Sequence, residues 1–172
     1  MGLRVRARLE DDLPALAEIL VRVHAQDGYP VEGVADPTAW LTPERQIAAW
    51  TADLDGEPIG QAALTAADPL DDAARVWHET TGGDVATLAI PVRLFIDPAR
   101  RKNGAASRLL HAIQTHAADH DLDLAFDVML KDRDAIRLYE ALGCVRIGTL
   151  THHHSNGATE PAAVYTMRRT DR

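Results

Sequence analysis

The stretch LFIDPARRKNGAASRLL, residues 94–110, leads from an apolar strand through a short basic turn into a helix. A strand that ends near Pro98 and a helix that begins near Gly104 place the helix's free backbone N–H groups beside the strand end, and such groups bind anions. Gly104 lets a ligand approach the main chain, while Ala105 and Ala106 add no bulk. These features predict a pyrophosphate site; the alternative is a tight turn whose cations are solvated.

Hydrophobic periodicity on both sides of this stretch predicts a mixed α/β chain. Asp55 and Gly56 separate two apolar-rich runs, which is a strong signal for a β-hairpin. Pro91 interrupts an apolar strand and predicts a bulge there, because proline cannot donate to a sheet. Two stretches, 26–42 and 66–84, are less regular, with room for a short helix in each. The expected strands cover 3–9, 46–54, 58–65, 85–96, 122–130, 145–150 and 162–168, and the expected helices cover 13–24, 105–119 and about 132–142.

The composition predicts one ordered domain, residues 1–172. A chain of 172 residues, of which 46% are hydrophobic, can bury a single core. The net charge of −8 argues against a nucleic-acid partner. Segment 1–20 has an acidic pair where a signal peptide needs an apolar run, and no window reaches the length of a membrane span. The single cysteine, Cys144, cannot form an internal disulfide, so we expect a cytoplasmic protein without a membrane partner.

Two blocks of the sequence resemble the signatures of the GNAT (GCN5-related) superfamily of N-acetyltransferases. Residues 94–110 resemble its acetyl-CoA motif, RxxGxG or RxxGxA after a strand and before paired leucines. Residues 131–148, KDRDAIRLYEALGCVRIG, resemble its second signature, but Asp132 replaces the usual asparagine and Cys144 the usual phenylalanine. The matching positions are Ile96, Pro98, Arg101, Gly104, Ala106, Leu109 and Leu110 in the first block and Ala135, Arg137, Leu138, Tyr139, Glu140, Leu142 and Gly143 in the second.

The resemblance implies a fold and a reaction. The fold is of the α/β class, a mixed α+β arrangement with a largely antiparallel central sheet flanked by helices. Acetyl-CoA is the implied cosubstrate, with no metal, and its acetyl group is transferred directly to a primary amine of a small molecule or peptide. Family members often dimerise through their C-terminal strands, which leaves room for a homodimer. The implied cofactor-binding residues are Leu94, Phe95 and Ile96 along the pantetheine, Arg101, Lys102, Asn103, Gly104, Ala105, Ala106 and Ser107 at the pyrophosphate, and Asp132 and Ala135 in the second block.

Tyr139 occupies the family's position for the acid that protonates the departing thiolate. Free phenol and thiol groups have pKa values of about 10 and 8.5, so the transfer is only modestly uphill. The alternative is a helix tyrosine that packs on the sheet. A general base is not assigned. Its candidates, each of which can equally be an ordinary surface residue, are Glu79, His78, Asp84, His24 and Asp27.

Other residues suggest weaker hypotheses. Three aromatic side chains, Tyr29, Trp40 and Trp77, could line an acceptor pocket or close small satellite cores. Residues 152–154 are consecutive histidines and are expected in a surface loop, where they make a poor metal site. Cys144 is expected in the core. The competing functions are a non-catalytic acyl-CoA-binding sensor of the same fold and a metal or pH sensor built on the eight histidines.

Overall fold

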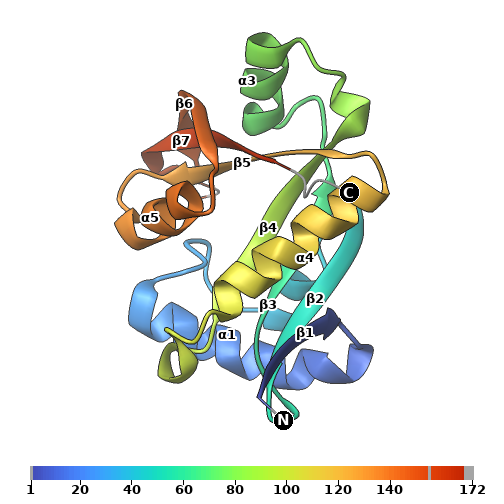
Figure 1. The fold of residues 1–172 in the computed structure, drawn as a ribbon. Coiled ribbons are helices and arrows are strands. Elements are labelled where there is room, and N and C mark those ends of the chain that lie inside the picture. Colours follow the sequence, from blue (N-terminus) through green and yellow to red (C-terminus); the bar gives the residue numbers. More distant parts are fainter. Residues whose placement is uncertain (1, 155, 169–172) are drawn as a thin grey trace. The chain divides into compact units, whose positions relative to one another are not determined.

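The computed structural model describes residues 2–154 and 156–168, which form seven strands and the helices that connect them (Figure 1). None of the helices in these ranges combines the length and apolar character needed to cross a membrane. In chain order the elements are β1 (Leu3–Ala7), η1 (Glu10–Asp12), α1 (Leu13–Asp27), α2 (Pro37–Leu41), β2 (Gln46–Leu54), β3 (Glu57–Ala66), α3 (Asp72–Thr81), η2 (Val85–Thr87), β4 (Leu88–Ile96), η3 (Pro98–Arg100), α4 (Ala105–Asp119), β5 (Asp123–Met129), α5 (Arg133–Ala141), β6 (Val145–His153) and β7 (Thr159–Met167).

The strands follow the order β1-β2-β3-β4-β5-β7-β6. Pairs β1–β2, β2–β3, β5–β7 and β6–β7 are antiparallel, whereas β4 and β5 pair in parallel. This mixed, mostly antiparallel sheet with flanking helices confirms the predicted fold class. The chain divides into two compact units: unit 1 runs up to Thr65 and includes Val92–Ile113, and unit 2 comprises Ala66–Pro91 and the chain from Gln114 onward. A single domain over residues 1–172 stays a prediction.

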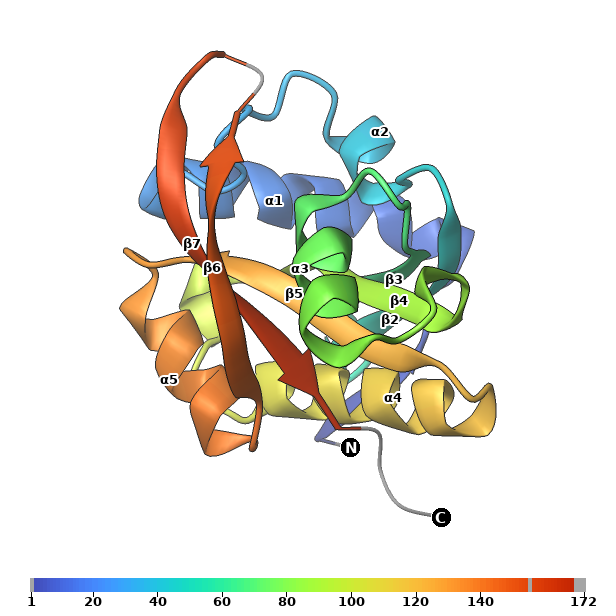
Figure 2. The same ribbon diagram turned by 90° about the horizontal axis from the view of Figure 1, so that it is seen from above.

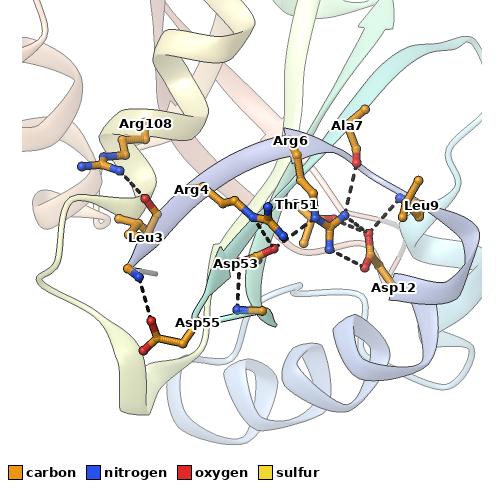
Figure 3. Close-up of polar contacts among 12 residues, drawn as sticks. Leu3, Arg4, Arg6, Ala7, Leu9, Asp12, Thr51, Asp53, Asp55 and Arg108 are labelled. Atoms are coloured by element: carbon orange, nitrogen blue, oxygen red, sulfur yellow. Dashed lines mark hydrogen bonds and ion pairs between the residues drawn. The ribbon is translucent and has the colours of Figure 1, made fainter.

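In unit 1, an ion-pair network ties β1 to β2 and to the start of α1 (Figure 3). The Arg6 guanidinium donates two hydrogen bonds to the Asp12 carboxylate, at 2.7 and 2.9 Å, and a third to Asp53 at 3.1 Å. Arg4 also donates to Asp53, and the Thr51 hydroxyl donates to Asp12. Both carboxylates are buried, so the arginines compensate for the loss of water around them.

The second half of β4 is irregular at Arg93, which has a positive φ of 59°. This irregularity comes two residues after Pro91, inside the strand where the sequence predicts a bulge. The fully buried Gln61 of β3 forms a hydrogen bond with this irregular segment. Its Nε2 donates to the Arg93 carbonyl oxygen at 3.0 Å, and its Oε1 accepts from Arg8. A side chain thus supplies a hydrogen bond to the distorted main chain of β4.

In unit 2, strands β5, β7 and β6 lie between two helices (Figure 1). Helix α3 packs on one face, where a Cβ added to Gly148 of β6 would come within 2.8 Å of the Val76 side chain. Helix α5 packs on the other face, where the Tyr139 ring lies 4.6 Å from the Phe126 ring. Strands β6 and β7 form a long antiparallel hairpin (Figure 2).

Most predicted elements are present, but the ends of some strands differ. The hairpin turn is formed by Asp55 and Gly56, with φ of 54° and 89°. Strand β6 extends to His153, so the expectation that residues 152–154 lie in a loop is wrong for its first two histidines. They pair with β7 at Glu160 and Thr159, because the hairpin continues past Leu150. That register pairing cannot be read from local sequence pattern.

Candidate functional site

The turn between β4 and α4, where the sequence predicts the pyrophosphate site, lies wholly in unit 1. Lys102 and Gly104 both adopt left-handed backbone conformations, with φ of 64° and 84°. The Asn103 side chain accepts a hydrogen bond from the Ala105 amide, and the Arg108 amide donates to the Gly104 carbonyl. The first amides of a helix lack partners within it, so those of Ala106 and Ser107 can serve a ligand. The predicted pyrophosphate site therefore has suitable backbone geometry.

Gly104 is required here for its conformation. A Cβ added to Gly104 would meet no atom within 4 Å, but its φ of 84° disfavours any side chain. Gly104 and Lys102 are exposed, so an anion can reach the turn from solvent.

The Arg101 side chain is engaged within the protein. Its guanidinium donates to the Asp27 carboxylate at the end of α1 and to the Ile96 carbonyl oxygen. Arg101 thus holds the end of β4 and the turn against α1. Lys102, for which no ion pair is found within the described part of the chain, is the better placed cation for a ligand.

The main chain expected to contact pantetheine runs from Leu94 to Ile96 at the end of β4. Leu94 is half-buried, whereas Phe95 and Ile96 are buried. Phe95 belongs to the core formed with α1 and α2. On the other side, Gly60 of β3 packs so closely that a Cβ there would lie 2.4 Å from the Phe95 carbonyl oxygen. These contacts hold the strand end rigidly.

The aromatic side chains proposed for an acceptor pocket separate into two sets. In unit 1 the Tyr29 and Trp40 rings meet edge to face at 5.5 Å, and the Arg93 guanidinium lies 4.4 Å above the Trp40 ring. Trp77 lies in unit 2, where it is buried against Gly83. Trp77 therefore acts in the core, whereas Tyr29 and Trp40 adjoin the irregular part of β4.

Tyr139 lies in unit 2, on α5. Burial raises the pKa of its phenol to about 12, so the hydroxyl remains a hydrogen-bond donor at neutral pH. Against a free thiol pKa of about 8.5, complete proton transfer is more uphill than the sequence suggested. Hydrogen-bond donation to a thiolate is the role that this environment favours.

The other residues of the second block lie in α5 or directly beside its ends. Asp132 is the N-cap residue of α5, and its carbonyl oxygen accepts from the Ile136 amide. Ala135 is half-buried in the first turn of that helix. Gly143 follows the helix with a φ of 83°. Cys144 is buried, and burial raises the pKa of its thiol to about 11, as expected of a core residue rather than a nucleophile.

The five candidate bases all have structural partners. His24 Nδ1 lies 3.0 Å from the Pro30 carbonyl oxygen, and Asp27 pairs with Arg101. The other three candidates lie in α3 or just after it. Glu79 pairs with Arg75, His78 contacts the Gly83 carbonyl oxygen, and Asp84 accepts a hydrogen bond from the Ala86 amide.

A histidine–aspartate pair that the sequence reasoning missed lies in unit 2. His152 Nδ1 is 3.2 Å from Asp127 Oδ2, joining β6 to β5. Burial raises the pKa of Asp127, and the opposing effect of His152 does not cancel it. The available signal was Asp127 itself, an ionisable residue inside the apolar strand LDLAFDVML. Among the described residues, no group of three or more histidine, cysteine or acidic side chains is arranged to hold a metal ion.

Comparison with known proteins identifies the family. The family model described as "Acetyltransferase (GNAT) family" matches residues 13–144. No curated protein sequence matches the chain. Similar solved structures include an N-acetyltransferase from Staphylococcus aureus (17% identity, 99% of this chain and 100% of that chain, TM-score 0.73). Another is Arabidopsis thaliana NAA60 in complex with acetyl-CoA (17% identity, 96% of this chain and 99% of that chain, TM-score 0.72). A third is a ribosomal-protein-alanine N-acetyltransferase from Brucella melitensis (18% identity, 96% of this chain and 99% of that chain, TM-score 0.74).

The family match spans most of the chain, and the structures share its fold. The chain belongs to the GNAT acetyltransferase family. The predicted family is thereby confirmed, while the roles of individual residues stay predictions.

Proposed function

We propose that this protein is an acetyl-CoA-dependent N-acetyltransferase that acts directly on a primary amine of a small molecule or peptide. The observation that carries the proposal is the β4–α4 turn, where left-handed Lys102 and Gly104 and the first amides of α4 provide an anion site in a chain of this family. Acetyl-CoA supplies the activated acetyl thioester when bound. NAA60, a structural neighbour, was solved in complex with acetyl-CoA.

The residues of unit 1 would hold the cofactor mainly through the main chain. The amides from Lys102 to Ser107 would bind the pyrophosphate, and the Lys102 ammonium would add charge. The main chain of residues 94–96 would bind the pantetheine arm and polarise the thioester carbonyl through a backbone N–H. In unit 2, Asp132 and Ala135 would contact the arm.

Tyr139 would supply a hydrogen bond to the departing sulfur. Its pKa of about 12 keeps the phenol protonated, so it can stabilise negative charge there as a neutral donor. The net charge of −8 favours a cationic acceptor. We propose a cytoplasmic enzyme without nucleic-acid or membrane partners, with dimerisation through the C-terminal strands as an option.

Calorimetry with acetyl-CoA and a thiol-release assay across an amine panel test this function. Binding and thiol release with at least one amine are expected. Absence of acetyl-CoA binding would exclude both an acetyltransferase and an acyl-CoA sensor, whereas binding without turnover on any amine would favour the sensor.

Tyr139→Phe tests the role of the phenol, with Tyr165→Phe as a matched control. Tyr165 stacks 5.9 Å from the same Phe126 ring, and its hydroxyl donates to Glu140. Tyr139→Phe should lower kcat about a hundredfold with unchanged acetyl-CoA affinity. Tyr165→Phe should keep kcat within about twofold while losing about 1 kcal/mol of stability. Equal kcat in the wild type and Tyr139→Phe would remove the proposed role.

Gly104→Ala tests the turn, with Gly82→Ala as its control. Both glycines have positive φ and space for a Cβ, but Gly82 follows α3 in unit 2. Each substitution should cost about 1 kcal/mol of stability because of backbone strain. Only Gly104→Ala should weaken acetyl-CoA binding, by about tenfold; equal affinities in the two variants would argue against the turn as the pyrophosphate site.

A further inference from the structure

The pair formed by His152 and Asp127 has the arrangement of a positioned general base. His152 Nδ1 lies 3.2 Å from Asp127 Oδ2. A carboxylate can accept but cannot donate a hydrogen bond, so the proton of a neutral imidazole lies on Nδ1. The lone pair is then on Nε2, the nitrogen that points away from Asp127. This is the tautomer that a base needs.

The His152 side chain is exposed enough to contact a ligand. The Asp127 side chain is less exposed and can fix the orientation of the His152 ring. The His152 side chain is 38% exposed, whereas that of Asp127 is 25% exposed. The His152 ring also lies 4.7 Å from the ring of His154, whose side chain is only 4% exposed. His152 is thus held by contacts on two sides while part of its ring remains accessible.

Asp127 and Tyr139 occupy opposite faces of the sheet in unit 2. The Tyr139 ring packs on Phe126, the residue that precedes Asp127 in β5. Successive side chains of a strand point to opposite faces, so Asp127 projects toward the face on which α3 packs. In the strand register, His152 lies opposite Glu160 of β7, and Asp127 lies opposite Val164 of the same strand. Glu160 and Val164 are four residues apart, an even number, so His152 shares that face. In the tetrahedral intermediate the attacking nitrogen and the departing sulfur are separate substituents of one carbon, so different side chains can serve them.

We propose that His152 is the general base for the acceptor amine and that Asp127 is its positioning residue. This inference rests on the proposed acetyltransferase function. The acceptor ammonium gives a proton to His152 Nε2, and its nitrogen then bonds to the acetyl carbon while the carbon–sulfur bond breaks. The second proton lost from the nitrogen leaves to water, and His152 later releases its proton to water. The thiolate, which accepts a hydrogen bond from Tyr139, takes one proton back from water. The products are an amide and a free thiol.

Other ionisable groups surround the pair. Asp72 of α3 acts electrostatically on Asp127. Glu160 of β7 lies 3.6 Å from His154 and forms an ion pair with Lys131 at 2.7 Å. Acidic groups of β5, α3 and β7 therefore interact with members of the cluster formed by His152, Asp127 and His154.

The pH dependence of turnover tests the proposal. His152→Gln should lower kcat/KM about a hundredfold or more at pH 7 with acetyl-CoA and the best acceptor among spermidine, L-lysine and an alanine-initiated peptide. The loss should shrink at least tenfold by about pH 10, because α-amino groups with a pKa of about 8 have then lost their proton to water and alkylamines with a pKa of about 10.4 are partly neutral. A structural role would give the same loss at every pH, and that result would overturn the proposal.

A matched control is His153→Gln, because His153 is the exposed next residue of β6. It should keep kcat/KM within about twofold across the pH range. Asp127→Asn should lower kcat/KM about tenfold, since an amide can also donate to Nδ1 and no longer selects one tautomer. A loss in His153→Gln as large as in His152→Gln would also contradict the assignment.

NMR of the imidazole nitrogens provides a readout that needs neither cofactor nor acceptor. Long-range ¹H–¹⁵N spectra of the free protein should show His152 with its proton on Nδ1 when neutral, and a mixture of tautomers in Asp127→Asn. A neutral His152 protonated on Nε2 would overturn the proposal. Failure of acetyl-CoA to bind the wild type by calorimetry would instead overturn the proposed function, whatever the tautomer.

Discussion

Two carboxylate sites, a buried one in unit 1 and a half-buried one in unit 2, differ in how their charge is balanced. In unit 1, Asp12 and Asp53 each accept hydrogen bonds from arginine (Figure 3). The hydrogen bonds from Arg6 lower the pKa of Asp12 to about 2. Burial alone would raise the pKa of Asp53, but Arg4 and Arg6 lower it overall. In unit 2, burial raises the pKa of Asp127, whose side-chain partner is a histidine.

The difference separates a structural site from the site for which we propose chemistry. An arginine remains charged at all ordinary pH values, so a carboxylate paired with it has a constant environment. A histidine can change its charge near neutral pH, so a carboxylate paired with it can support a proton transfer. The first arrangement stabilises the N-terminal strands, and the second lies on the strands for which we propose catalysis.

The largest expected effect comes from removing the shared arginine. Arg6→Met leaves Asp12 and Asp53 without their common partner and should lower the free energy of unfolding by about 3 kcal/mol, measured by urea denaturation. Arg4→Met is the control: its side chain is 62% exposed, so the loss should stay below about 1 kcal/mol. Similar losses in both variants would contradict the central role of Arg6.

The free energy of unfolding should depend on pH because the pKa of Asp12 is lowered in the folded protein. Its folded pKa of about 2 is below the ordinary aspartate value of 3.8, so its contribution is complete above the unfolded pKa and is lost as pH falls toward 2. The loss should amount to about 2 kcal/mol between pH 5 and pH 2. Urea titrations of the wild type and Asp12→Asn measure it, and an equally steep acid loss in Asp12→Asn would rule out this source.

Asp127→Asn should have the opposite stability profile. A raised folded pKa means that the contribution of Asp127 is complete below its unfolded pKa and is lost as pH rises through the folded value. At pH 7 the substitution should therefore leave the free energy of unfolding unchanged or raise it by up to about 1 kcal/mol. Asp53→Asn, the matched change in unit 1, should lower it by about 1 to 2 kcal/mol. A loss in Asp127→Asn as large as in Asp53→Asn would remove the contrast between the sites.

The smallest effect is expected at an exposed ion pair in unit 2. Arg137 and Asp134 pair at 3.2 Å on the surface of α5, and both side chains are at least three-quarters exposed. Arg137→Gln should change the free energy of unfolding by less than about 0.5 kcal/mol. A larger loss in urea denaturation would show that exposed pairs contribute here as buried ones do.

Local patterns in the sequence predicted much of this molecule. The helix at 105–119, the hairpin at Asp55 and Gly56, and the turn around Gly104 each depend on residues that are close in the chain. Pro91 predicted an irregular strand, although the unusual backbone conformation itself falls on Arg93. The charge of Asp127 in a mostly apolar strand was visible too, but its partner was not.

The sequence by itself determined the family, the β4–α4 turn and the position of Tyr139, because helical periodicity, turn conformation and signature spacing are properties of adjacent residues. Only the tertiary structure decided that the guanidinium of Arg101 is engaged by Asp27, that Trp77 belongs to the core, and that His152 meets Asp127. Those contacts depend on strand order and register, with β7 lying between β5 and β6. Register is set by pairing between distant segments, which no local pattern encodes.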